Sequence, residues 1–374
     1  MKMPIQNNVI CRAALVLAFG SFALCASAAS TIVTQAVDGV SWTINIDSST
    51  GKAMIGPVTK TQDGWAMAQY RAFSTPTHNK PSYPGIVSIP SSFTVTVGET
   101  ETEYEVNKIG NRAFYGLGGI TDVVIPSTVV QIYDFAFHAC DDLKNVCLKG
   151  PITADRGQSQ TYVSLARSAN AFGSATQTRN IQLVLMGPNI KNGSDDTVIA
   201  AGATNMTVLL PNRSDNTTWS SFDASSKVGS GENNTVKFYG PGEAFDLKMY
   251  ETSVTILPTT AAALADALAW APTFKSGFGL DTHISITNAI DTTIDVSEHP
   301  GVTFDTQVWQ KFKASSQAQL DGTLAAVSTD SSIIIDATDA TEDIVIPEGR
   351  RVAVTVPPGG AFWRQRRGFI LMFK

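Results

Sequence analysis

The sequence has few of the residues on which disulfide scaffolds and catalytic centres depend. Its 374 residues include four cysteines and four histidines, and 16% of the residues are charged. Two of the cysteines lie in the first 28 residues, so a chain cut there keeps Cys140 and Cys147. Two cysteines can form only one disulfide bond, which is too few to stabilise a chain of this length. Its fold must therefore depend on a hydrophobic core.

Positive charge is also scarce. The sequence has 27 Lys and Arg residues against 33 Asp and Glu residues, a formal net charge of −6. Six of the cations follow Glu348, in a stretch without acids, so the body of the chain is more acidic than the total. Because nucleic-acid binding needs cations that displace counterions from phosphates, this composition argues against a nucleic-acid partner.

Long apolar runs are absent outside the N-terminus. There, Lys2 and Arg12 are followed by a 12-residue apolar run from Ala13 to Leu24 and by small residues ending at Ala28. This order is typical of a secretory signal, and the run is too short to span a bilayer. We therefore expect a signal peptide over residues 1–28, no transmembrane span, and a protein that is secreted or displayed on the cell surface.

A 23-residue period is the clearest internal pattern. The apolar positions of one segment recur in the next as Ile109/Ile132, Ala113/Ala136, Phe114/Phe137, Leu117/Cys140, Ile120/Leu143, Val123/Val146 and Ile125/Leu148. Each unit alone cannot bury its apolar face, so the pattern predicts stacked coils whose phenylalanines form a continuous inner column. Alternation in the last residues of each unit predicts short strands.

These residues resemble the BspA-type leucine-rich repeats of bacterial surface proteins. The resemblance is carried by IPSTVVQIYDFAFHACDDLKNVCL, from Ile125 to Leu148, and covers residues 86–150. It implies a leucine-rich-repeat solenoid in a secreted or cell-surface interaction protein. The implied role is adhesion or ligand binding, with an extracellular protein or glycan as partner.

The segments before and after the two 23-residue repeats predict further β-structure. A strand–turn–strand pattern over residues 39–56 predicts an N-terminal β cap within residues 29–85, and a hairpin is expected over residues 93–106. Beyond residue 150 the resemblance loosens. Apolar residues at fixed offsets before prolines predict strands near 123, 146, 183, 208 and 236. In this prediction Val146/Leu148, Leu183/Leu185 and Val236/Phe238 occupy equivalent positions. We therefore assign residues 86–242 to the solenoid.

From about residue 243 the pattern changes. Thr259 and Thr260 are placed to cap a helix that runs to Ala271, and a second helix is expected around Leu320 and Leu324. Short alternating strands follow each helix, most of them with an offset of 50 residues. Residues 243–358 are therefore predicted as a duplicated β-rich region, a β-solenoid or a sandwich. Part of it, IIIDATDATEDIVIPEGRRVAVTVP, resembles the opening coils of right-handed parallel β-helices in exported bacterial proteins.

The last segment, residues 359–374, is basic and aromatic, unlike the sequence before it. One interpretation is an anchor to a membrane surface or a partner through Trp363, Phe369 and Phe373. The other is a disordered or truncated tail.

No catalytic or cofactor motif is present. The sequence has no G-x-S-x-G, H-E-x-x-H, P-loop or G-x-G-x-x-G pattern, so we predict no enzyme activity, no catalytic residues, no cofactor and no metal. Loose Ca²⁺ binding by Asp195 and Asp196, or by Asp336 and Asp339, is an alternative. A Cys140–Cys147 disulfide is disfavoured, because one residue is expected to point into the solenoid and the other outward.

Ligand contacts are expected on the outward side of the strands. The candidate residues are Val124 and Cys147 with their neighbours Lys144, Asn145 and Lys149. Two other functions stay open: a polysaccharide-active enzyme that uses paired carboxylates of the C-terminal half, and a structural envelope protein that self-assembles. The sequence specifies no oligomeric state.

Overall fold

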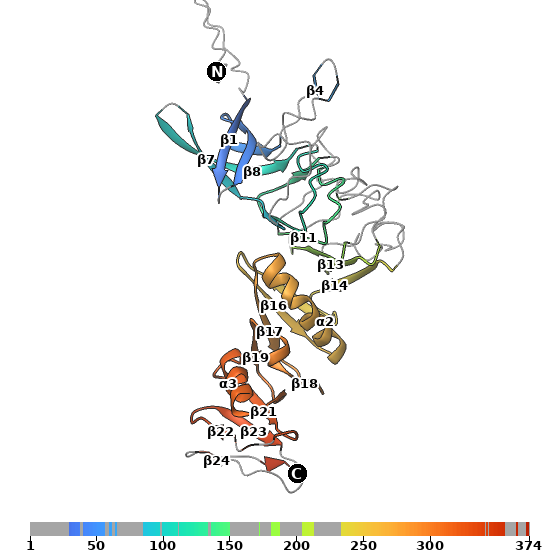
Figure 1. Cartoon of the computed structure of the whole chain (residues 1–374), viewed down its shortest axis with the longest axis vertical. Coiled ribbons are helices and arrows are strands. Elements are labelled where there is room, and N and C mark those ends of the chain that lie inside the picture. The colour runs from blue at the N-terminus through green and yellow to red at the C-terminus, as the bar shows by residue number, and fades with distance from the viewer. Residues whose placement is uncertain are drawn as a thin grey trace, which may run out of the picture.

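The computed structural model describes residues 30–37, 40–56, 60–61, 64–65, 85–97, 99–110, 112–133, 136–149, 172, 181–187, 204–212, 233–340, 342, 344–355, 364–365 and 372–373. Together they form an elongated molecule in which strands stack from one end to the other (Figure 1). The expected signal peptide lies outside the described residues, and so does the C-terminal tail except for two short strands.

The N-terminal sheet has six strands and joins the predicted cap to residues 92–132 of the predicted solenoid. Its strands are β1 (Ser30–Val37), β2 (Val40–Asp47), β3 (Lys52–Ile55), β7 (Ser92–Val97), β8 (Thr100–Ile109) and β10 (Gln131–Ile132). Their order is β1-β2-β3-β8-β10, and β7 pairs antiparallel with β8. A two-stranded ribbon, β4 (Lys60–Thr61) and β5 (Gly64–Trp65), lies outside this sheet. Both the strand–turn–strand unit and the hairpin predicted from the sequence are confirmed.

The repeat region is a parallel sheet of six strands. These are β6 (Ile86–Ser88), β9 (Asp122–Ile125), β11 (Asn145–Leu148), β12 (Leu183–Met186), β13 (Thr207–Pro211) and β14 (Thr235–Tyr239). Val123 pairs with Val146 and Ile125 pairs with Leu148, which is the 23-residue period seen in the sequence. The predicted strands near 123, 146, 183, 208 and 236 are all present, and the predicted β-rich solenoid is confirmed.

Phenylalanine side chains form the predicted inner column. Phe114 stacks on Phe137 with ring centroids 4.7 Å apart, and Phe137 stacks on Phe172 at 5.3 Å. Both pairs of rings are parallel to within 6°. All three side chains are buried, so the column fills the interior between consecutive coils.

The register predicted for the strand near 183 is wrong by one residue. Val184, not Leu183, pairs with Val146, and Leu183 faces the opposite side of the sheet. The prediction assumed a constant distance between the strand and the following Gly-Pro. Gly187 is instead fixed by the previous coil, because a Cβ at this position would lie 2.5 Å from the carbonyl oxygen of Lys149.

The C-terminal region consists of two similar units, each of which begins with a strand and a helix and continues with three strands; the first unit also contains the short helices η2 and η3. The first contains β16 (Ser253–Pro258), α2 (Ala261–Pro272), η2 (Thr273–Gly277), β17 (Asp281–Ile286), β18 (Thr293–Ile294), η3 (Val296–Glu298) and β19 (Val302–Thr306). The second contains β20 (Gln310–Lys313), α3 (Gln317–Ala326), β21 (Ser332–Asp336), β22 (Val345–Ile346) and β23 (Arg351–Thr355). Strands β16, β17 and β19 pair in parallel, as do β20, β21 and β23, and β18 of the first unit pairs in parallel with β20 of the second. This region is therefore a solenoid rather than a sandwich.

Three further strands complete this region. β15 (Phe245–Met249) pairs antiparallel with β16, while β24 (Arg364–Gln365) and β25 (Met372–Phe373) extend the second unit in parallel. The two predicted helices are confirmed. The hydroxyl of Thr260 accepts a hydrogen bond from the backbone N–H of Ala263 at 3.1 Å, and Ser316 caps α3 in the same way. Both residues thus satisfy N–H groups that a helix start leaves unpaired.

Candidate interaction surfaces

The outer face of the repeat sheet is buried over its middle strands, whereas Ile86 and Ser88 of β6 are exposed at one edge. Val124 and Cys147 point away from the phenylalanine column, as the sequence predicts, but they are only 5% and 0% exposed. They belong to one hydrophobic cluster with residues of the C-terminal region, including Ile256, Leu264 and Phe274. Neither residue therefore forms part of an open ligand surface. The prediction placed them on an exposed face because it treated the repeat region without its neighbour.

Polar side chains also lie at the junction of the two regions, and one of them, Lys149, bonds across it. The Nδ2 of Asn145 donates to Asp122 Oδ1 at 2.6 Å, and a Cβ on Gly277 of the C-terminal region would lie 2.5 Å from that oxygen. Lys149 Nζ donates to the carbonyl oxygen of Glu251 at 2.6 Å. Asn145 and Lys149 therefore also contribute to the junction of the two regions. Of the five residues predicted to bind a ligand, Lys144 stays exposed to solvent.

The two cysteines lie in separate hydrophobic clusters, and both are free thiols. Cys140 faces the phenylalanine column and its Sγ lies 3.1 Å from the carbonyl oxygen of Phe114. Cys147 lies between the repeat sheet and the C-terminal region, and burial raises the pKa of its thiol to about 12. The inward and outward positions expected from the sequence explain why the two residues are not bonded.

A row of stacked side chains runs along the turns of the repeats. The rings of Tyr115 and His138, 23 residues apart, are parallel with centroids 5.1 Å apart. The guanidinium carbon of Arg112 lies 5.6 Å from the centre of the Tyr115 ring. We call Arg112, Tyr115 and His138 the turn ladder. All three are partly exposed, so this row presents planar and cationic groups at the surface.

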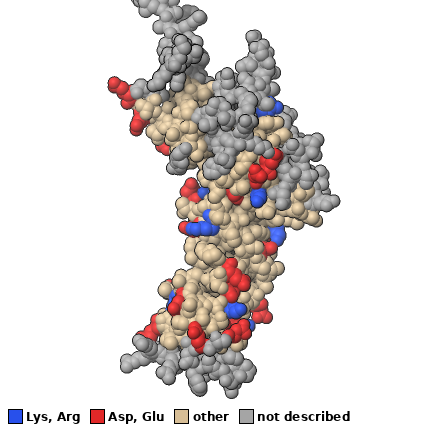
Figure 2. Space-filling view, viewed as in Figure 1, with Lys and Arg blue, Asp and Glu red and all other residues tan. Residues whose placement is uncertain are grey.

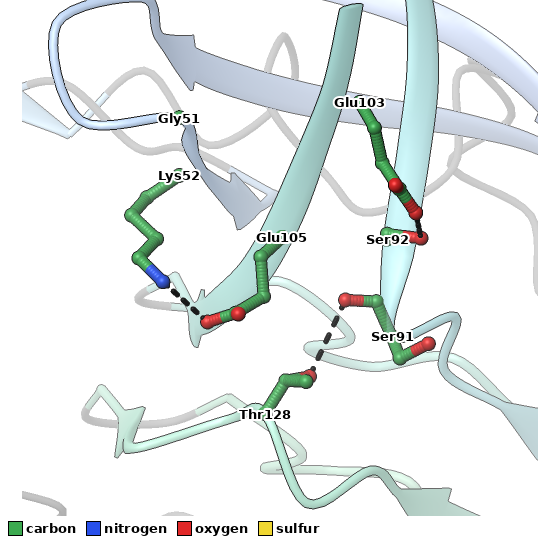
Figure 3. Close-up of a pocket in the computed structure, with 7 residues that line it drawn as sticks. All are labelled: Gly51, Lys52, Ser91, Ser92, Glu103, Glu105 and Thr128. Atoms are coloured by element: carbon green, nitrogen blue, oxygen red, sulfur yellow. Dashed lines mark hydrogen bonds and ion pairs between the residues drawn. The ribbon is translucent and has the colours of Figure 1, made fainter.

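A cavity of about 330 Å³ lies where the cap meets the repeats. It is lined by residues from β3, from the β7–β8 hairpin and from the turn before β10: Gly51, Lys52, Ser91, Ser92, Glu103, Glu105 and Thr128 (Figure 3). Lys52 Nζ lies 2.6 Å from Glu105 Oε1, and the Ser92 hydroxyl donates to Glu103 Oε1 at 2.6 Å. The Thr128 hydroxyl donates to the carbonyl oxygen of Ser91 at 3.3 Å.

This cavity was not predicted from the sequence, although part of its signal is there. Glu101, Glu103 and Glu105 alternate along one strand, and alternation places all three on the same face. What the sequence does not reveal is that Lys52 and Thr128, from distant segments, close the other sides.

Acids of the C-terminal region hold its turns and, at Asp295, link its two units. Asp295 accepts a hydrogen bond from Gln319 Nε2 at 2.9 Å and lies 4.0 Å from Lys313 Nζ. Burial pushes the pKa of Asp295 upward, but hydrogen bonds from Ser297 and Gln319 outweigh it and leave the pKa lowered. Asp336 accepts from the backbone N–H and hydroxyl of Thr338.

Metal-ligating and membrane-spanning features are absent from the described part of the chain. It contains no group of three or more His, Cys, Asp and Glu side chains placed to hold a metal ion, and Asp195 and Asp196 lie outside it. Within that same part, no helix is both long and apolar enough to cross a membrane.

Known proteins resemble this chain in its repeats. Residues 92–162 match the family described as BspA type Leucine rich repeat region (6 copies). No curated protein matches the chain.

Three solved structures are similar to the chain. A leucine-rich repeat protein from Bacteroides capillosus is 17% identical, with 55% of this chain and 99% of that chain covered and a TM-score of 0.25. A leucine-rich cell surface protein from Faecalibacterium prausnitzii is 12% identical, with 88% and 95% covered and a TM-score of 0.24. A leucine-rich repeat protein from Bacteroides ovatus is 11% identical, with 87% and 98% covered and a TM-score of 0.22. With its in-register coils and its family match, the chain carries a BspA-type leucine-rich-repeat region.

Proposed function

We propose that the chain is an exported, non-enzymatic interaction protein that binds an extracellular protein partner. The observation that carries this proposal is the BspA-type repeat region over residues 92–162. Such repeats are typical of secreted or surface proteins of bacteria with interaction or adhesion roles. Adhesion to a host or neighbouring cell is the specific form of the role that we propose.

The proposed contact surface is the turn ladder rather than the strand face. The strand face is unsuitable because the C-terminal region covers Val124 and Cys147. The turn ladder offers a tyrosine, a histidine and an arginine, and tyrosine and arginine are enriched in protein interfaces. Lys144, exposed before β11, is proposed as an additional contact.

The proposal is tested with the chain lacking residues 1–28 on an array of matrix proteins and glycans, run beside a screen for polysaccharide hydrolysis. We expect capture of a protein and no turnover. Tyr115→Ala should weaken the capture by at least about tenfold, because central aromatic residues dominate such interfaces. Tyr250→Ala, which removes a 56% exposed tyrosine from the C-terminal region, is the matched control.

Two results would contradict the proposal. One is hydrolysis of a polysaccharide by the purified chain. The other is a bound protein whose affinity falls equally with Tyr115→Ala and with Tyr250→Ala, since the turn ladder would then have no special role.

A further inference from the structure

The cavity at the junction of cap and repeats is large enough to admit a side chain of a partner. Three segments far apart in the sequence form its walls: β3 with Lys52, the β7–β8 hairpin with Glu103 and Glu105, and the turn that contains Thr128 (Figure 3). Its volume of about 330 Å³ is at the lower end of the range for small-ligand pockets. A long side chain of a partner fits such a space.

The lining of this cavity favours a cation. It contains two carboxylates and one ammonium group. Among the described carboxylates, the ammonium group of Lys52 forms an ion pair only with Glu105. Glu103 accepts a hydrogen bond from a neutral hydroxyl, that of Ser92. Glu101 and Glu99 continue the negative charge along the hairpin, and Figure 2 shows carboxylates at its projecting end. An incoming ammonium group would therefore meet a net negative surface.

The hairpin also has a strand edge that is unpaired within the described part of the chain. Strand β7 pairs with β8, and no other described strand pairs with it. Its buried face carries Phe93 and Val95, while Thr94 and Thr96 are exposed on the face that carries the glutamates. An extended peptide added to this edge would direct every second side chain toward that face.

We propose that the cavity and the adjoining β7–β8 hairpin bind an extended, lysine-rich peptide segment of a partner protein. One lysine of the partner enters the cavity and takes the place of Lys52 beside Glu105, and further lysines lie along Glu103 and Glu101. This inference rests on the proposed function and adds the chemistry of the partner.

The experiment measures binding of a fluorescent octapeptide of alternating lysine and threonine to the purified chain by anisotropy. An octapeptide of alternating glutamate and threonine serves as the probe control. The double substitution E103Q/E105Q should weaken binding of the lysine peptide by at least about tenfold, because charge-assisted hydrogen bonds are lost. The matched control E298Q/E348Q removes the same charge from the exposed surface of the C-terminal region and should change binding less than about twofold.

Two more variants separate a binding role from a structural one. Lys52→Met should tighten binding several-fold, because it frees the Glu105 carboxylate, whereas damage to the fold would weaken binding. Thr128→Trp fills the cavity without changing its charge and should weaken binding about tenfold.

The inference fails if Lys52→Met weakens binding, if E298Q/E348Q weakens it as much as E103Q/E105Q, or if the glutamate peptide binds equally well. It also fails if the array yields a partner that depends on Tyr115 while the lysine peptide does not bind. In that last case the proposed function stands and this inference alone is overturned.

Discussion

The repeat region and the C-terminal region both stack parallel strands, but they cover them differently. Most strands of the C-terminal region alternate buried residues with exposed or partly exposed ones, as β17 does, and the helices α2 and α3 bury leucines against the same core. In the repeat region β11 and β12 are buried on both faces. One face packs on the phenylalanine column and the other on the C-terminal region.

This difference shows that the pattern of apolar residues along a strand indicates how many of its two faces are buried. Alternation indicates one buried face, whereas a continuous apolar run such as Leu183–Met186 indicates two. Strands β11 and β12 therefore depend on the neighbouring region for the burial of one of their two faces. We expect the two regions to unfold together, and the predictions below test that expectation from the largest effect to the smallest.

The largest effect is expected from Leu185→Asp. Leu185 is fully buried in the cluster that joins the two regions. The substitution removes apolar packing and buries an unpaired charge, so we expect a loss of at least about 5 kcal/mol of unfolding free energy. Chemical denaturation measures it. Thr235→Asp, on an exposed position of the same sheet, is the control. Near-equal midpoints for the two variants would show that the regions do not depend on each other.

Phe137→Ala should cost about 3–5 kcal/mol, because it removes the middle ring of the stacked column. Phe312→Ala, at a fully buried position in the C-terminal region, should cost a similar amount. If the two regions are one cooperative unit, each substitution shifts a single calorimetric transition. Two transitions, with each variant shifting only one of them, would show that the two regions unfold independently.

The thiol of Cys147 gives a pH-dependent effect of intermediate size. Its pKa is raised from about 9 to about 12 by burial, so the folded state keeps the proton when the unfolded state loses it. Stability from this group is complete below pH 9 and falls by about 1.4 kcal/mol per pH unit between pH 9 and 12.

We therefore expect the wild type to lose about 2 kcal/mol more than Cys147→Ala between pH 8 and about pH 10.5. Denaturation at the two pH values measures this difference. Parallel losses in the two proteins would mean that the thiol reaches water, and hence that the junction of the regions is open.

The smallest effect concerns two equivalent turns within the repeat region. Gly116 has φ 68°, and Ala139, 23 residues later, has φ 59°. Left-handed backbone is strained for alanine but not for glycine, so Ala139→Gly should stabilise the protein by up to about 1 kcal/mol. Thermal denaturation measures the gain. Gly116→Ala should do the opposite, and a loss of stability with Ala139→Gly would contradict the argument.

Much of the fold was predictable because the relevant patterns are local. The 23-residue spacing placed Phe114 and Phe137 correctly, since equal spacing in a solenoid means equal position in successive coils. The surface residues were harder to predict. The sequence predicts Val124 and Cys147 to be outward and open, because nothing near them in the sequence shows that the segment around Leu264 covers them. The cavity was missed for a similar reason, since Lys52 and Thr128 meet only in the folded chain.

The contact between the repeat sheet and the C-terminal region limits how this protein can evolve. An open solenoid gains or loses whole coils at little cost, since each coil touches only its neighbours. Here an extra 23-residue unit between β9 and β11 would move Val124 away from Cys147 and carry Asp122 out of reach of Gly277. The number of coils is therefore coupled to the shape of a distant segment, and insertions of whole coils are tolerated only beyond the covered strands.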